Sequence, residues 1–206
     1  MAGILIGMPI DDTTSSRTLS ARHRKLVLKI EYLEAELAEA HEFMNDATVE
    51  FTTAYHLCLS TYSDDERDSV EGKVKKAQPP DPPEVQKTEG DEKEVKKLFR
   101  KIAGETHPDK LAHMEKETQE VREGLFDKAK KACAELNWYE LSRLAEHLNL
   151  NIPSISEGHV NMLENSAQLL QQKIAVFQST VAWQWYALNP VEKQGEFMHA
   201  YVKSML

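Results

Sequence analysis

Apolar residues recur along residues 26–58 at steps of three and four. The positions are Leu26, Ile30, Leu33, Leu37, Ala40, Met44, Ala47, Phe51, Ala54 and Cys58. A 3.5-residue period sustained over several heptads predicts a long helix whose apolar seam faces another helix. A second apolar line, at Val27, Tyr55 and Leu59, keeps another interpretation open: a wider stripe suits a helix that lies on a globular core.

The same period returns near the C-terminus of the chain. Its positions are Leu163, Ala167, Leu170, Ile174, Phe177, Val181, Gln184 and Leu188. Asn189-Pro190, followed by Glu192, predicts the end of that helix and the cap of a short last one. We expect the two heptad helices to pair with each other or with other copies of the chain.

Two segments lack this pattern. Residues 63–92, which read SDDERDSVEGKVKKAQPPDPPEVQKTEGDE, have almost no large apolar residue and carry the proline run at 79–83. Such a composition predicts an extended spacer between domains. The N-terminal stretch MAGILIGMPI is apolar, but it has no basic residue and breaks at Pro9, so it predicts an arm and not a membrane span.

The middle of the chain predicts shorter helices. Asp91 followed by Glu94 resembles a capping box, and a helix would run from there to about Thr106. One of its faces is apolar (Val95, Leu98, Phe99, Ile102) and another is basic (Lys93, Lys96, Lys97, Arg100, Lys101).

Two more helices follow in this region. The first, over residues 117–136, has Val121, Leu125, Ala129, Ala132 and Leu136 on its apolar face. Asn137 with Glu140 predicts the cap of the second, which places Leu141, Leu144, Ala145 and Leu148 inward. No long segment alternates with period two, so we predict an all-α fold.

Composition narrows the function. The chain has 206 residues, of which 41% are hydrophobic and 29% charged, with a net charge of −9. This acidic balance argues against nucleic-acid binding, which needs clustered Lys and Arg, so any basic surface must be local. Cys58 and Cys133 are far apart in sequence on apolar faces, which favours packed, reduced thiols over a disulfide.

The tripeptide His107-Pro108-Asp109 ends the basic helix. Proline has no amide hydrogen and disfavours a helical conformation in the residue before it, so the helix must stop here. The loop then presents an imidazole, a carboxylate and the ammonium of Lys110 side by side.

Residues 93–136 together resemble a J-domain, the DnaJ-like co-chaperone module that docks on a DnaK-type chaperone and stimulates its ATP hydrolysis. The resemblance lies in the basic helix with Phe99-Arg100-Lys101-Ile102-Ala103, the His-Pro-Asp loop and the apolar helix that follows, with Phe126 and Ala129 at interior positions. Two departures stand out. The family's first helix is not visible upstream, and its short basic fourth helix is replaced by the apolar NWYELSRLAEHLNL.

The resemblance implies different roles for the basic helix and for the His-Pro-Asp loop. Lys96, Lys97, Arg100 and Lys101 would steer the basic helix onto an acidic face of the chaperone. Asp109 would pair with an arginine of the chaperone, while His107 and Pro108 set the shape of the loop and Lys110 adds to the contact. The chain itself would be no enzyme and would need no cofactor or metal, because the partner hydrolyses ATP.

Other interpretations of the same residues are weaker. His107, Asp109 and His113 have no further ligand nearby and a spacing that suits no common metal site. A catalytic thiol needs an activating partner, and the basic stripe could be a solvated helix face. The aromatic run Trp183 to Tyr186 is more typical of packing than of a docking surface.

The sequence therefore predicts five segments: an arm (1–18), a long heptad helix (19–62), a Pro-rich acidic spacer (63–92), a J-domain-like hairpin with an appended helix (93–150), and a C-terminal heptad helix with a short capping helix (159–206). We expect a cytoplasmic adaptor that recruits a DnaK-type chaperone, without nucleic-acid or membrane partners. The alternative is a structural or assembly protein whose hairpin is not active. By analogy with small J-domain-like proteins of large tailed phages, this could be a virion component. In either case we expect the appended helix at residues 138–148, alone or together with the helix over residues 160–188, to cover the apolar face of the hairpin.

Overall fold

The computed structural model describes residues 12–74, 89–111, 115–188 and 191–206, and these parts of the chain contain helices and no strand. The prediction of an all-α fold is confirmed. The helices form two compact units. The first unit comprises described residues of 1–31 and 85–168, and the second comprises described residues of 32–84 and 169–206. No described helix is both long and apolar enough to cross a membrane.

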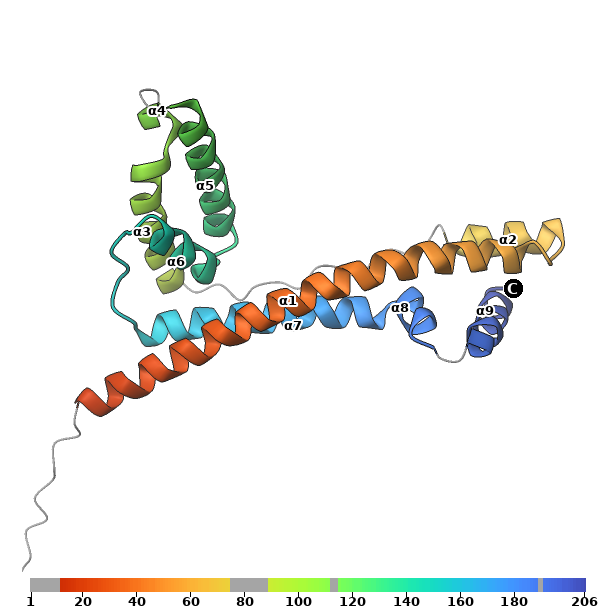
Figure 1. Cartoon of the computed structure of the whole chain (residues 1–206). Coiled ribbons are helices and arrows are strands. Elements are labelled where there is room, and N and C mark those ends of the chain that lie inside the picture. Colours follow the sequence, from red (N-terminus) through yellow and green to blue (C-terminus); the bar gives the residue numbers. More distant parts are fainter. Residues whose placement is uncertain (1–11, 75–88, 112–114, 189–190) are drawn as a thin grey trace, which may run out of the picture. The chain divides into compact units, whose positions relative to one another are not determined.

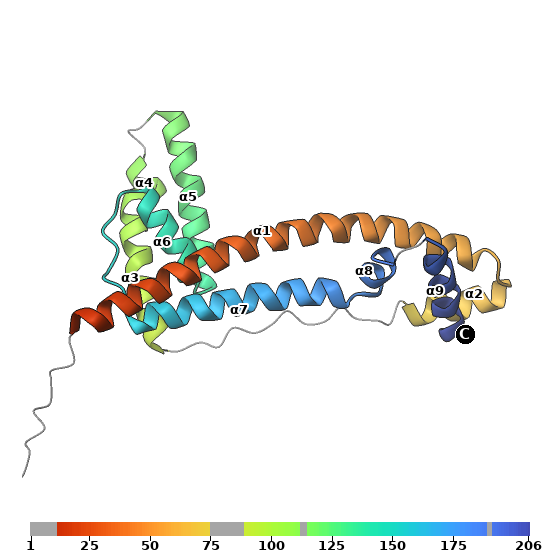
Figure 2. The ribbon, with the colours of Figure 1, turned by 60° about the horizontal axis from the view of Figure 1, so that its bottom comes forward.

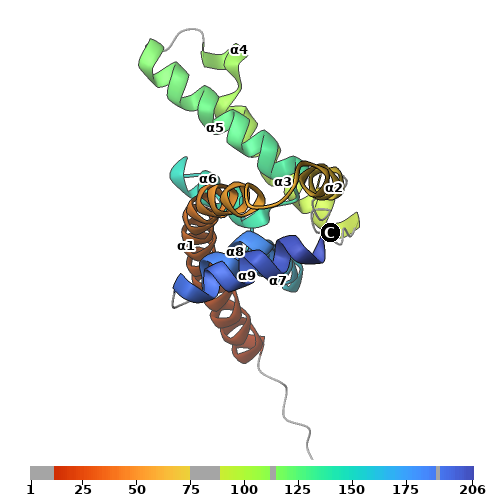
Figure 3. The ribbon, with the colours of Figure 1, turned by 90° about the vertical axis from the view of Figure 1, so that its right-hand side faces the viewer.

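The first unit is built around a helical hairpin. Its helices are α3 (Glu89–Thr106), α4 (Pro108–Leu111), α5 (Lys116–Ala134) and α6 (Trp138–His147), together with the first parts of α1 (Asp12–Leu59) and α7 (Glu157–Ser179). α3 and α5 lie side by side, and the single turn of α4 marks the end of the hairpin where the chain reverses direction (Figures 1 and 3).

The hairpin closes its core with α6, which packs against both α3 and α5. Val95, Leu98 and Ile102 of α3 are fully buried, whereas Phe99 is half-buried. The other buried apolar side chains of α3 to α6 are Leu111, Ala129, Ala132, Trp138, Tyr139, Leu141, Leu144 and Ala145. The expectation that residues 138–148 cover the apolar face of the hairpin is thus confirmed.

The turn from α5 to α6 combines two helix caps. Leu136 adopts a left-handed conformation (φ 55°), and its N–H donates to Cys133 O while the N–H of Asn137 donates to Ala132 O. These are the two hydrogen bonds of a Schellman motif, which usually has glycine at the left-handed position. The side chain of Asn137 then accepts from the N–H of Glu140 at 3.1 Å. The predicted cap at Asn137 is confirmed.

The second unit contains the rest of α1 and α7 together with α2 (Asp64–Val74), α8 (Val181–Tyr186) and α9 (Val191–Ser204). In this unit α7 runs parallel to α1 (Figure 2): the ring of His41 contacts that of Phe177, and the hydroxyl of Thr180 lies 3.3 Å from Met44 Sδ. The core cluster consists of Tyr55, Cys58, Leu59, Val70, Trp185, Met198 and Val202.

The predicted seam of α1 faces protein along its length. Every one of its ten positions is buried or half-buried, with Ile30 and Ala47 the least exposed. Tyr55 and Leu59, from the second apolar line, are buried as well. The end of α1 is therefore a helix on a globular core, which is the second interpretation that the sequence left open.

Three predicted boundaries are wrong. α1 begins at Asp12, so residues 12–18 are helix and not arm; residues 1–11 lie outside the described part. Residues 64–74 form α2 and not an extended spacer, because Val70 supplies an apolar contact to the core of the second unit. The proline run at 79–83 lies outside the described residues. α3 begins at Glu89, so Asp91 lies inside the helix.

The C-terminal heptad helix is not continuous to residue 188. α7 ends at Ser179, and Thr180 takes an extended conformation and caps α8 by accepting from the N–H of Trp183 at 3.2 Å. A threonine side chain competes with the backbone for such hydrogen bonds, which explains the break. Trp185 is 5% exposed, and Trp183 packs on Phe43 with ring centroids 4.2 Å apart, so the prediction that these aromatics pack inside is confirmed.

Candidate functional site

Carbonyl groups near the end of α3 accept hydrogen bonds, and these bonds hold the loop that follows the helix in place. The last carbonyl groups of a helix lack helical partners and must be satisfied in another way. Here Thr106 Oγ1 donates to Ile102 O (2.8 Å), His107 N to Ala103 O (3.0 Å), Lys110 Nζ to Gly104 O (2.9 Å) and Arg122 Nη1 to Glu105 O (2.8 Å). Two cations therefore complement the negative end of the helix dipole.

The His-Pro-Asp loop is a short helical turn. Pro108 is the first residue of α4, a position where its fixed φ and missing N–H are tolerated. The N–H of Lys110 donates to His107 O at 2.9 Å, and Leu111 is 1% exposed. The turn is thus anchored at both ends, by α3 before it and by the buried leucine after it.

Asp109 is far more exposed than His107. Its side chain is 88% exposed and that of His107 is 44% exposed. The imidazole packs edge-on against the ring of Phe126, with centroids 5.1 Å apart. His107 Nδ1 lies 3.3 Å from the N–H of Asp109 and 3.5 Å from the Asp109 carboxylate. The neutral ring can accept from the backbone, and the protonated ring can pair with the carboxylate, so in both states His107 orients Asp109.

The predicted basic stripe lies on the exposed face of α3. The four side chains of this stripe that were predicted to contact a chaperone, Lys96, Lys97, Arg100 and Lys101, are all exposed. Lys96 pairs with Glu92 at 2.8 Å, and this hydrogen bond raises the pKa of Lys96. Lys101 Nζ donates to Asn151 O at 2.9 Å.

No partner among the described residues engages Lys97 or Arg100. All eight residues predicted for the site thus lie on α3 and the adjoining turn of one unit. The sequence suggested that the Lys110 ammonium would contact the chaperone. In the structure this ammonium donates to Gly104 O, a carbonyl at the end of α3.

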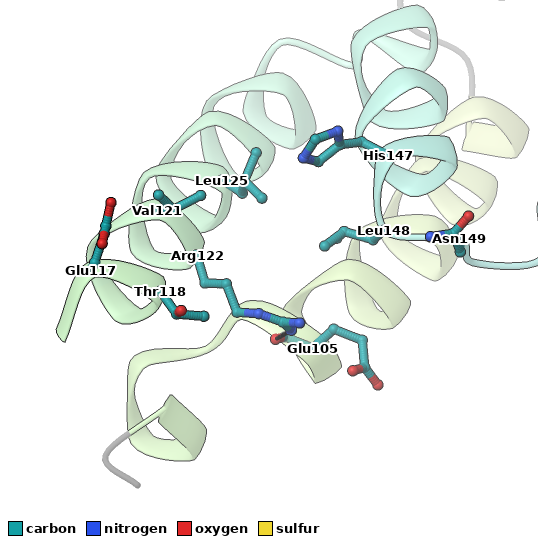
Figure 4. A pocket seen from close by; sticks show the side chains of 9 residues that line it. All are labelled: Glu105, Glu117, Thr118, Val121, Arg122, Leu125, His147, Leu148 and Asn149. Carbon is teal, nitrogen blue, oxygen red and sulfur yellow. Dashed lines mark hydrogen bonds between the residues drawn. The ribbon is translucent and has the colours of Figure 1, made fainter. Parts of the chain in front are cut away.

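A groove lies on the neighbouring side of the hairpin, between the end of α3, α5 and the end of α6. Its volume is about 450 Å³. Val121, Leu125 and Leu148 give it apolar walls, and Arg122 reaches across toward Glu105 (Figure 4). The sequence did not indicate this groove, because its residues come from three helices whose packing no local pattern specifies.

The other proposed chemistries have little structural support. Within the described residues no three His, Cys, Asp or Glu side chains are grouped as a metal site would require, and His113 lies outside them. Cys58 Sγ lies 3.4 Å from His199 Nδ1, a neighbour that the sequence did not reveal. Burial raises the pKa of both Cys58 and Cys133, which favours the protonated thiols over reactive thiolates. Both cysteines are free, as predicted.

Comparisons with known proteins add nothing to these observations: no family model, curated protein or solved structure matches the chain.

Proposed function

We propose that the chain is a J-domain-like adaptor, which recruits a DnaK-type chaperone through His107–Lys110 and the basic stripe of α3 and stimulates its ATPase. The observation that carries this proposal is the exposure of the Asp109 carboxylate. Its carboxylate is 88% exposed on an anchored turn, and His107 is the one group among the described residues within ion-pair distance of it. Such a carboxylate is ready for a charge-assisted pair with an arginine of a partner.

The basic stripe supports the same partner. Lys97 and Arg100 extend from the helix that ends at the loop, so one protein surface could contact both. Clustered exposed cations on an otherwise acidic chain accelerate association with an acidic surface. The chain would do no chemistry itself, and would act by shifting the conformational equilibrium of the chaperone.

Substitutions in the loop test the proposal. His107→Gln and Asp109→Asn should each reduce stimulation of a DnaK-type ATPase by about tenfold or more, because a hydrogen bond to a charged group contributes about 1.5–3 kcal/mol. Helical content should not change, since both side chains are in an exposed turn. The measurement is single-turnover ATP hydrolysis by the chaperone over a range of concentrations of the chain.

Matched controls are His147→Gln and Asp127→Asn, which make the same chemical changes at exposed positions of α6 and α5. These variants should stimulate like the wild type. If the wild-type chain gives no stimulation with any DnaK-type chaperone tested, the co-chaperone proposal is wrong.

A second candidate function is assembly, and one observation favours it. α1 exposes four large apolar side chains, Leu28, Tyr32, Val49 and Leu57, each more than half accessible. Large exposed apolar residues often mark protein contacts. In this case the long helices would bind other copies or a larger structure, such as a virion, and the hairpin would have no chaperone activity. Sedimentation of the purified chain tests for contacts between copies. The ATPase measurement separates the two functions, because only the co-chaperone function requires stimulation of the chaperone.

A further inference from the structure

A buried histidine, which the proposed function does not use, lies in the first turn of α7. His159 is 3% exposed. Its ring stacks on that of Trp138 in α6, with centroids 4.0 Å apart and an angle of 9° between the planes. This stack attaches the beginning of α7 to the helical bundle within the first unit.

The same histidine caps its own helix. The N–H of His159 donates to Ser156 Oγ at 3.3 Å, and His159 Nδ1 accepts from the N–H of Ser156 at 3.2 Å. This is the reciprocal pattern of a capping box, with an imidazole in place of the usual Glu or Gln. Because Nδ1 accepts, the ring hydrogen is on Nε2 and the imidazole is neutral.

Charged groups approach the ring from two other helices. Nε2 lies 3.8 Å from Glu94 Oε2 of α3, which is longer than a hydrogen bond, and it has no hydrogen-bond partner among the described residues. His23 of α1 is close enough that its positive form would repel a second charge on His159. Glu146 of α6 faces His23 in turn. Burial is the largest cause that lowers the pKa of both histidines.

Protonation of His159 would weaken some of these contacts and strengthen others. A proton on Nδ1 removes the acceptor for the Ser156 N–H and places a charge in a site nearly closed to water. The Glu94 carboxylate and the face of the Trp138 ring would attract that charge. The Glu94 side chain is 42% exposed, however, so water screens its attraction, and we expect the lost cap and the buried charge to dominate.

We propose that His159 makes the attachment of α7 sensitive to acid. The neutral imidazole holds the first turn of α7 against the Trp138 ring, and the protonated imidazole releases it. The ion pairs of Arg22 with Glu157 and Glu164 also join α1 to α7, but their side chains are about half exposed, so they do not replace the lost contact. This inference goes beyond the proposed function and does not depend on it.

The direction of the pH effect follows from the lowered pKa. Above the ordinary value of 6.5 the histidine is neutral in the folded and the unfolded chain, and the attachment has its full strength. As the pH falls below 6.5 the unfolded chain takes up protons first, so stability declines. The decline stops once the pH is below the pKa of the folded state.

The test uses the full chain. The pKa of His159 is measured from its ring Cε1 signal by NMR, and amide exchange of residues 157–163 is measured at pH 7.5 and 5.5 and corrected for intrinsic rates. We expect a His159 pKa below 6.5 and exchange that becomes at least about tenfold faster at pH 5.5 in the first turn of α7.

His159→Gln is the decisive variant, because Gln can form the same capping box and does not titrate. It should abolish most of the pH dependence, whereas the exposed control His147→Gln should keep it. A His159 pKa at or above 6.5 in the wild type would overturn the proposal, even if the variant does not fold. An equal pH dependence in wild type and His159→Gln would overturn it too.

Discussion

Single side chains decide how the helices of the first unit end and begin. Pro108 and Asn137 could be recognised in the sequence, because proline stops a helix and asparagine caps one regardless of what surrounds them. Leu136 and His159 could not. A left-handed leucine and a capping imidazole are rare uses of those residues, and each exists because of hydrogen bonds to its neighbours. The local rules thus found the common caps and missed the unusual ones.

The cap at Asn137 gives a prediction at this scale. Asn137→Ala should lower the stability of α6 by about 1 kcal/mol, since the N–H of Glu140 loses its acceptor. Amide exchange of residues 138–147 in the full chain measures this effect directly. Asn151→Ala is the matched control, because Lys101 binds the Asn151 backbone and not its side chain. Equal exchange in both variants would show that the cap contributes nothing.

At the scale of elements, periodicity located most helices but not their exact lengths. The faces of α3, α5 and α6 were predicted from apolar spacing, and the buried residues agree except at the start of α5, where Val121 is 57% exposed. α2 was missed, since a charged helix with one buried valine carries almost no periodic signal and is held by contacts with distant residues. The break at Thr180 was missed for a related reason: the heptad spacing continues through it, and only the side-chain hydrogen bond interrupts the helix.

The basic stripe of α3 supports an element-scale prediction. Lys97 and Arg100 have no partner among the described residues. Reversing both, with Lys97→Glu and Arg100→Glu together, should slow association with a DnaK-type chaperone by about tenfold or more at low salt, because like charges would then meet. The difference in association rate between the variant and the wild type should shrink at about 0.5 M salt, because charges then interact over only a few ångströms. Association rates from stopped-flow or surface binding provide the measurement.

The control for that experiment changes the net charge equally at another place. Lys128→Glu with Lys130→Glu reverses two exposed cations of α5. If this control slows association as much as the α3 variant does, then the total charge steers the partner and the stripe has no specific role.

At the scale of the whole molecule, the chain divides its apolar residues between two units, and α1 and α7 contribute to both. The composition of residues 63–92 predicts a domain boundary there, but the heptad pattern predicts the long helices as segments of their own. A heptad pattern shows that a face is buried without showing what buries it. The partner of each seam residue depends on packing between residues more than a hundred positions apart, as in the contact of His41 with Phe177.

The hairpin itself should be separable from the rest of the chain. A module of about 60 residues is close to the lower limit for independent folding, and α3 with α5 alone would expose much of the apolar face of α3. α6 supplies Trp138, Leu141 and Leu144 to that core, so a fragment of residues 88–150 should melt cooperatively when followed by circular dichroism. Extending it to residue 168 should raise the melting temperature at pH 7.5, because His159 then covers Trp138. A molten short fragment that becomes cooperative only on extension would show that α6 is insufficient and that α7 completes the core.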